Sequence, residues 1–164
     1  MELNDAQAIR NLGVNYSQGD FGLTRDYTKA LELLTRAEEL GHVEAYYSIG
    51  YAYEFGQGVN RDTKKAEYYY ELGAIGGDVD SRYSLGGLEM KRGNVERFIK
   101  HWLIAAGGGD KDSLSNIQKL YRNGRVTKDE YTKALRAYQK YLSEVKSPQR
   151  DEAAAAREEN YKYL

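Results

Sequence analysis

A unit of about 36 residues recurs along this 164-residue chain, and this repetition limits the fold more than any other feature. The clearest copy starts at Ala45 and runs AYYSIGYAYEFGQGVNRDTKKAEYYYELGAIGGDVDS. In this copy an apolar segment with helical spacing is followed by a glycine turn, and a second helical segment is followed by a second glycine turn. Related segments start at Ala8, Ala45, Ser81 and Ser113, so consecutive starts are 37, 36 and 32 residues apart. A fixed period in this range predicts stacked supersecondary units.

Each unit is predicted to be a hairpin of two short helices. Ile49 and Tyr53 lie four positions apart and therefore share one helical face. Gly50 lets a neighbouring helix approach closely, and Asp62 is placed to cap the second helix. One hairpin cannot bury its apolar face alone, so the copies are expected to stack into a solenoid.

The motif A-x-x-x-[LI]-G-x-x-Y, followed by a glycine turn, D-x-x-K-A and A-x-x-G, resembles the Sel1-like repeat of the tetratricopeptide superfamily. The second copy carries nearly the whole motif, and the first copy keeps most of it. The third lacks the G-x-G-V loop, and the fourth has Gln118 where a small residue is usual. The resemblance covers about residues 8–142 and implies an all-α, right-handed α/α superhelix that binds other proteins.

We expect one domain over residues 1–164, with repeats at about 5–41, 42–77, 78–109 and 110–146. Ser147-Pro148 is expected to stop one helix and start another, giving a separate capping helix at about 148–163. Phe21 is expected to tuck under the first glycine loop. Asn94 is expected to cap the second helix of the third copy.

Composition excludes several kinds of chemistry. The chain has no Cys and two His, and it carries no H-E-x-x-H motif or phosphate-binding glycine loop, so we expect no enzyme activity, metal or cofactor. The net charge of −1 gives no electrostatic case for nucleic acid or an anionic membrane. Without a signal-like or transmembrane segment, the expected location is the cytoplasm.

The expected function is that of an adaptor that binds a peptide or partner protein on the concave face. Residues on the first helix of each copy, displaced from the core stripe, should line that face. They are Arg10 and Val14 in the first copy, Tyr47, Tyr51 and Glu54 in the second, Tyr83, Met90 and Lys91 in the third, and Ser115, Lys119 and Arg122 in the fourth. The groove is therefore predicted to be aromatic in the middle and basic at its C-terminal end, which suits a ligand with apolar and acidic residues.

Two alternatives stay open at this point. One is a solenoid that binds or hydrolyses a small molecule, although the sequence shows no convergent acid, base and nucleophile. The other is a structural or designed repeat array that associates with itself. For the adaptor, a monomer or a weak homodimer is expected.

Overall fold

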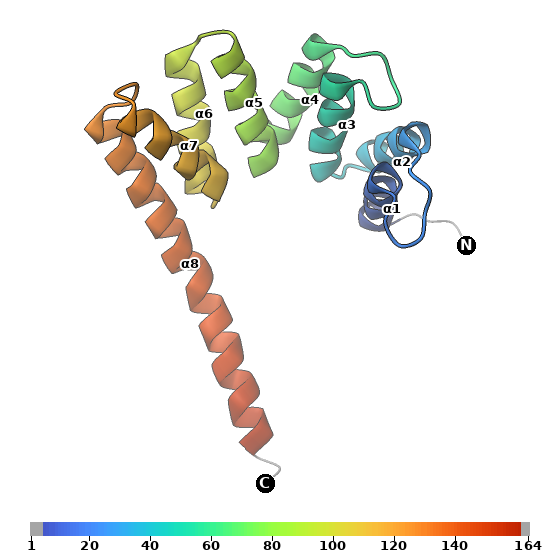
Figure 1. The fold of residues 1–164 in the computed structure, drawn as a ribbon. Coiled ribbons are helices and arrows are strands. Elements are labelled where there is room, and N and C mark those ends of the chain that lie inside the picture. Colours follow the sequence, from blue (N-terminus) through green and yellow to red (C-terminus); the bar gives the residue numbers. More distant parts are fainter. Residues whose placement is uncertain (1–4, 162–164) are drawn as a thin grey trace. The chain divides into compact units, whose positions relative to one another are not determined.

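The chain folds as a series of helix pairs. The computed structural model describes the backbone of residues 5–161 and the side chains of residues 5–144. Within residues 5–161 it contains eight helices and no strand, which confirms the all-α solenoid class (Figure 1). The helices are α1 (Ala6–Gln18), α2 (Tyr27–Glu39), α3 (Glu44–Phe55), α4 (Thr63–Ile75), α5 (Val79–Lys91), α6 (Val95–Gly107), α7 (Lys111–Arg122) and α8 (Lys128–Tyr161).

The chain divides into two compact units, whereas the sequence predicted one repeat domain. The first unit extends to Phe98 and the second begins at Ile99, so the division falls within α6. In the first unit, α1 packs on α2, α2 on α3, α3 on α4, and α4 on α5. Every candidate contact residue before Ser115 therefore belongs to the first unit.

Aspartate caps begin five of the described helices, and one of them is the cap expected at Asp62. Asp5, Asp26, Asp62, Asp78 and Asp110 each accept hydrogen bonds from backbone N–H groups of the turn that follows. Each carboxylate satisfies donors that have no partner inside the helix, and its charge interacts favourably with the positive end of the helix dipole. These caps fix where each helix starts and hence where its apolar stripe lies.

Small residues let the two helices of a repeat approach each other. A Cβ added at Gly50 would lie 2.7 Å from the Tyr70 ring and 3.2 Å from the backbone oxygen of Ala66. Gly50 therefore makes room for the tyrosine of α4, whose side chain is fully buried. This is the close approach that the sequence predicted for this glycine.

Two clusters of buried side chains join successive repeats in the first unit. One joins the first and second repeats and contains Ile9, Ala37 and Ala45. The other joins the second repeat to α5 and contains Ala66, Tyr70, Ala74, Leu85 and Leu88. Each cluster takes side chains from both sides of a repeat boundary, so burial of apolar surface stabilises the stacking as well as the hairpins.

The second unit has its own buried residues. Trp102 of α6, Ile117 of α7 and Ala134 of α8 are at most 3% exposed. A Cβ added at Gly107 would lie 3.6 Å from Cβ of Ala137, which shows that the end of α6 packs on α8.

The predicted break between the fourth repeat and a capping helix is wrong. The helix α8 begins with a capping box, because Thr127 Oγ1 accepts from the Glu130 N–H and Glu130 accepts from the Thr127 N–H. It then continues through Ser147 and Pro148 as one helix of 34 residues. A proline inside a helix removes one backbone hydrogen bond, but the alanine, glutamate and arginine residues that follow favour helix strongly. The expected polar outer face involves side chains beyond residue 144, outside the described part.

One smaller expectation is also corrected. Phe21 does not tuck under its loop, since it is 88% exposed and has a φ of 56°. Asn94 directly precedes α6, and its backbone oxygen accepts from the Phe98 N–H at 3.1 Å. Its side-chain amide also donates to the buried carboxylate of Glu89 at 2.6 Å.

Candidate functional site: a pocket between the first two helix pairs

A pocket of about 480 Å³ lies within the first unit, where α1, α2 and α3 meet. It is lined by Arg10, Val14, Ser17 and Gln18 of α1, Arg25 of the following loop, Tyr27, Ala30, Leu31 and Leu34 of α2, Tyr47, Ser48, Tyr51 and Ala52 of α3, and Gln57. Ala30, Leu34 and Ala52 are buried and form an apolar floor. The volume is sufficient for a few side chains of a bound segment.

An aromatic row follows one face of α3 along the pocket. The rings of Tyr47 and Tyr51 lie 6.2 Å apart, and those of Tyr51 and Phe55 lie 4.4 Å apart. Tyr47 is anchored, because it packs against buried Tyr70 at 6.0 Å. Tyr51 is 38% exposed and Phe55 is 53% exposed, so the row becomes more accessible toward the end of the helix. Exposed aromatic side chains held by a rigid helix are typical of binding anchors.

The hydroxyl of Tyr47 stays protonated well above neutral pH. Burial, followed by the nearby charge of Asp80, raises its pKa to about 12. Tyr47 therefore offers a ligand an apolar ring and a neutral hydroxyl.

Two arginines supply the positive charge of the pocket. Arg10 donates to Asn11 at 3.3 Å and lies 3.8 Å from a carboxylate oxygen of Glu44. Its Nε is buried and has no hydrogen-bond acceptor among the described residues. Arg25 donates to the backbone oxygen of Gln18 at 3.1 Å. Among the described lining residues none is Asp or Glu, so these two arginines are the charged side chains of the lining.

Glu54 is not part of the accessible face, which corrects the prediction from the sequence. It is 7% exposed, and its carboxylate accepts from the Tyr70 hydroxyl at 2.9 Å and from Lys91 Nζ at 2.7 Å. These contacts link α3, α4 and α5. Helical spacing alone placed Glu54 beside Tyr51, but side chains from two other helices cover it.

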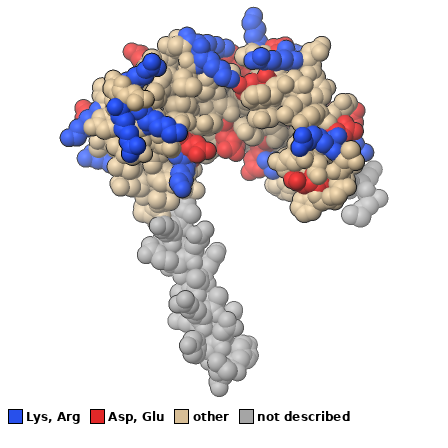
Figure 2. All heavy atoms as spheres, in the orientation of Figure 1, with Lys and Arg blue, Asp and Glu red and all other residues tan. Residues whose placement is uncertain are grey.

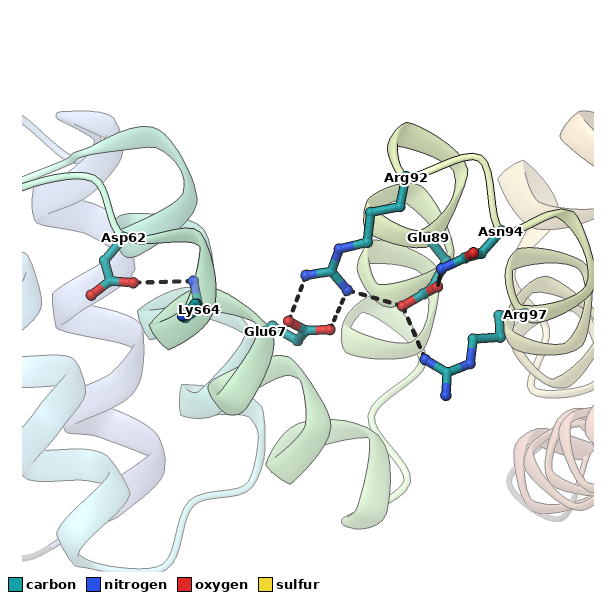
Figure 3. A network of polar contacts seen from close by, with 7 residues as sticks. All are labelled: Asp62, Lys64, Glu67, Glu89, Arg92, Asn94 and Arg97. Carbon is teal, nitrogen blue, oxygen red and sulfur yellow. Dashed lines mark hydrogen bonds and ion pairs between the residues drawn. The ribbon is translucent and has the colours of Figure 1, made fainter.

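A second polar network lies at the boundary between α4 and α5 (Figure 3). Arg92 donates to both carboxylate oxygens of Glu67 and, at 3.0 Å, to Glu89. Glu89 also accepts from Asn94 and lies 3.7 Å from Arg97. The hydrogen bond from Arg92 lowers the pKa of Glu67, and hydrogen bonds from Asn94 and then Arg92 lower that of Glu89. Arg92 and Glu89 connect all five residues through hydrogen bonds and ion pairs, so we interpret the network as structural.

Neither a metal site nor a membrane span is found in the described part of the chain. No group of three or more His, Cys, Asp or Glu residues there could hold a metal ion. None of its helices is both long and apolar enough to cross a bilayer. On the face drawn in Figure 2, lysine and arginine are interspersed with acidic and uncharged residues.

Comparison with known proteins identifies the repeats. The family model described as Sel1 repeat matches residues 6–42 and 43–78. Residues 6–78 of the chain are two Sel1 repeats.

Solved structures extend the likeness beyond the two matched repeats. The Sel1 repeat protein from Oxalobacter formigenes has a TM-score of 0.68 and 28% identity, covering 90% of this chain and 60% of that one. A protective antigen present in uropathogenic Escherichia coli strains, which has the same kind of fold, has a TM-score of 0.68 and 30% identity, covering 87% of this chain and 31% of that one.

Two eukaryotic proteins are similar in sequence. An ERAD-associated E3 ubiquitin-protein ligase component, HRD3B, from Arabidopsis thaliana is 34% identical over 61% of this chain. Chitin synthase regulatory factor 3 from Schizosaccharomyces pombe is 30% identical over 70% of this chain. The chain spans only 16% and 13% of these proteins, so the likeness concerns the repeats and not the whole of either protein.

The structure brings some of the predicted contact residues together. Arg10, Val14, Tyr47 and Tyr51 all line the pocket between the two Sel1 repeats. The other predicted residues do not line it. Of these, Tyr83 is half-buried and Met90 and Lys91 are exposed on α5, while Ser115 is half-buried and Lys119 and Arg122 are exposed on α7 of the second unit.

Several lining residues were missed from the sequence. Tyr27 and Leu31 come from α2, the second helix of its repeat, whereas only first helices were expected to contribute, and Arg25 comes from the loop before α2. No local pattern marks them, because their position depends on how α2 packs against α3. Phe55, at the rim of the row, follows Tyr51 by four residues, so helical spacing could have found it.

Proposed function

We propose that this protein is a non-catalytic adaptor that binds a segment of a partner protein in the pocket between its first two repeats. The observation that supports this most is the combination of an apolar floor, a row of aromatic rings and two arginines in one concave site. Such a surface offers burial for apolar side chains and hydrogen bonds for polar ones.

The architecture suits binding by a preformed surface. Each wall of the pocket belongs to a helix that packs on its neighbour, and Tyr47 is already held against the core. Little side-chain freedom is therefore lost on this protein's side, which favours affinity. Two similar proteins are named as a ligase component and as a regulatory factor, roles that involve other proteins.

Replacement of Tyr51 by Ala tests the proposal. Tyr51 is exposed and lines the pocket, so its loss should weaken partner binding by about tenfold or more without unfolding the chain. Tyr68→Ala is the matched control, since Tyr68 is a 56% exposed tyrosine of α4 that also contacts another ring but does not line the pocket.

The measurement is quantitative affinity purification from an extract of the source organism, with circular dichroism confirming that both variants are folded. A partner kept by the parent and by Tyr68→Ala, and lost by Tyr51→Ala, would support the pocket as the binding site. Equal retention by all three proteins would contradict it.

A further inference from the structure

We propose that the pocket is selective for an extended acidic segment in which two carboxylates, four residues apart, flank one apolar side chain. Arg10 would bind one carboxylate and Arg25 the other, at opposite ends of the pocket. This inference rests on the proposed function and adds to it the chemistry and spacing of the ligand.

The first argument is the hydrogen-bonding state of Arg10. Its side chain is 24% exposed, its nearest ion-pair partner lies at 3.8 Å, and its buried Nε has no acceptor among the described residues. A guanidinium can bind a carboxylate through two parallel N–H groups. The terminal nitrogens of Arg10, one of which has only the long contact to Glu44, are therefore the donors left for a ligand carboxylate.

The second argument is that Arg25 is also available. A guanidinium has five N–H donors, and the structure shows one hydrogen bond from Arg25, to the backbone oxygen of Gln18. That bond holds the cation beside the C-terminal end of α1 and leaves the other donors for a ligand. No Asp or Glu is found among the described lining residues, and the long contact of Glu44 with Arg10 is one that a ligand carboxylate would have to replace.

The third argument is the distance between the two cations along α1. Arg10 lies near the start of α1, and Arg25 is held at Gln18, eight residues further on. At 1.5 Å per residue, this separation along the helix axis is about 12 Å. In an extended peptide, residues four apart are about 13 Å apart and point to the same side. Carboxylates at positions i and i+4 of the ligand therefore match the two arginines.

The surface between the two arginines determines which kind of side chain the ligand should carry at position i+2. Val14 lies one helical turn from Arg10 and one turn from Gln18, and Leu31 and Tyr51 line the same pocket. The ligand side chain at position i+2 points into the same space. It should be apolar, since it would be surrounded by apolar and aromatic groups.

Selection from a random peptide phage library on the full chain tests this inference. We expect enrichment of peptides with Asp or Glu at i and i+4 and an apolar residue at i+2. A selected peptide, labelled and titrated by fluorescence anisotropy, should bind at least tenfold more weakly when either acid is replaced by its amide. Binding should also weaken as salt is raised, because the arginines are partly exposed.

Variants of the two arginines give the controls. Arg10→Gln together with Arg25→Gln should abolish enrichment of the acidic pair. Arg61→Gln should leave it unchanged, because Arg61 is exposed, lies after the second glycine turn as Arg25 lies after the first, and does not line the pocket. Circular dichroism of each variant establishes that the helices are intact.

The outcomes separate this inference from the proposed function. Two results would overturn the inference and leave the adaptor proposal standing. In one, the enriched peptides need Tyr51 but carry no acidic pair. In the other, the peptides bind the double arginine variant as tightly as they bind the parent. If no peptide is enriched, or if none depends on Tyr51, both proposals are contradicted.

Discussion

Replacing each of two helical glycines by alanine should change stability in opposite directions. Gly50 and Gly87 both lie inside first helices of repeats, in α3 and α5, and neither has a positive φ. In both places alanine favours the helix by roughly 1 kcal/mol. The two sites differ in what the added methyl group would touch.

At Gly50 the methyl group meets a side chain that cannot move away. It would lie 2.7 Å from two ring carbons of Tyr70, where contact carbons normally lie about 3.5–4.0 Å apart. Tyr70 is fully buried and its hydroxyl donates to Glu54, so the ring is fixed at both ends. Overpacking typically costs about 1–3 kcal/mol. Two ring contacts at 2.7 Å place this site in the upper half of that range, at about 2–3 kcal/mol. After the gain of roughly 1 kcal/mol in helix propensity, we expect Gly50→Ala to lower the free energy of unfolding by about 1–2 kcal/mol.

At Gly87 nothing lies within 4 Å of the added methyl group. Gly87→Ala should therefore raise the free energy of unfolding by about 0.5–1 kcal/mol. Urea titrations followed by circular dichroism at 222 nm measure both variants, and the fluorescence of Trp102 reports the second unit in the same samples. If Gly50→Ala is as stable as the parent, or if Gly87→Ala is less stable, the packing argument is refuted.

Two further predictions concern the polar networks. Arg92→Gln removes the hydrogen bonding that lowers the pKa of Glu67, and it removes one of the hydrogen bonds that Glu89 accepts. The free energy of unfolding at pH 7 should fall by about 1 kcal/mol, a modest amount because Arg92 is partly exposed. A carboxylate with a lowered folded-state pKa stabilises the fold above its ordinary pKa, and this stabilisation is lost as the pH falls through the folded-state pKa. Urea titrations at pH 7 and at pH 3 to 4 should therefore show the difference between parent and variant shrinking on acidification, and a constant difference would contradict the role given to this network. Tyr70→Phe removes a hydrogen-bond donor from the buried carboxylate of Glu54 and should lower the free energy of unfolding by about 1–3 kcal/mol in the same titration at pH 7. An unchanged midpoint would show that Lys91 alone satisfies Glu54.

The parts of the fold that depend on local chemistry could be predicted from the sequence. The caps at Asp26 and Asp62 and the box of Thr127 and Glu130 need only residues within the same turn. Gly50 could be predicted as well, because Gly13 and Gly86 stand at the same position of the first and third copies. Both kinds of feature are specified by spacing along the chain.

The parts that depend on packing between helices could not be predicted in the same way. Glu54 lies on the helical face expected for it, but Lys91 is 37 residues away in sequence and covers its carboxylate. Leu31 and Arg25 line the pocket because of the way α2 packs on α3, and no local sequence pattern predicts that packing. The continuity of α8 through Pro148 reflects a balance between one lost hydrogen bond and many helix-favouring neighbours.

The most direct test of the central claim is to ask what lies against position 51 in the assembled complex. A photoreactive phenylalanine analogue is placed at position 51, and in a second protein at position 68, and each is irradiated in an extract of the source organism. Position 51 lines the pocket and position 68 does not, although both natural tyrosines are exposed. We predict a crosslinked partner from position 51 and none from position 68. The same crosslinks from both positions, or crosslinks from position 68 alone, would contradict binding in the pocket between the first two Sel1 repeats.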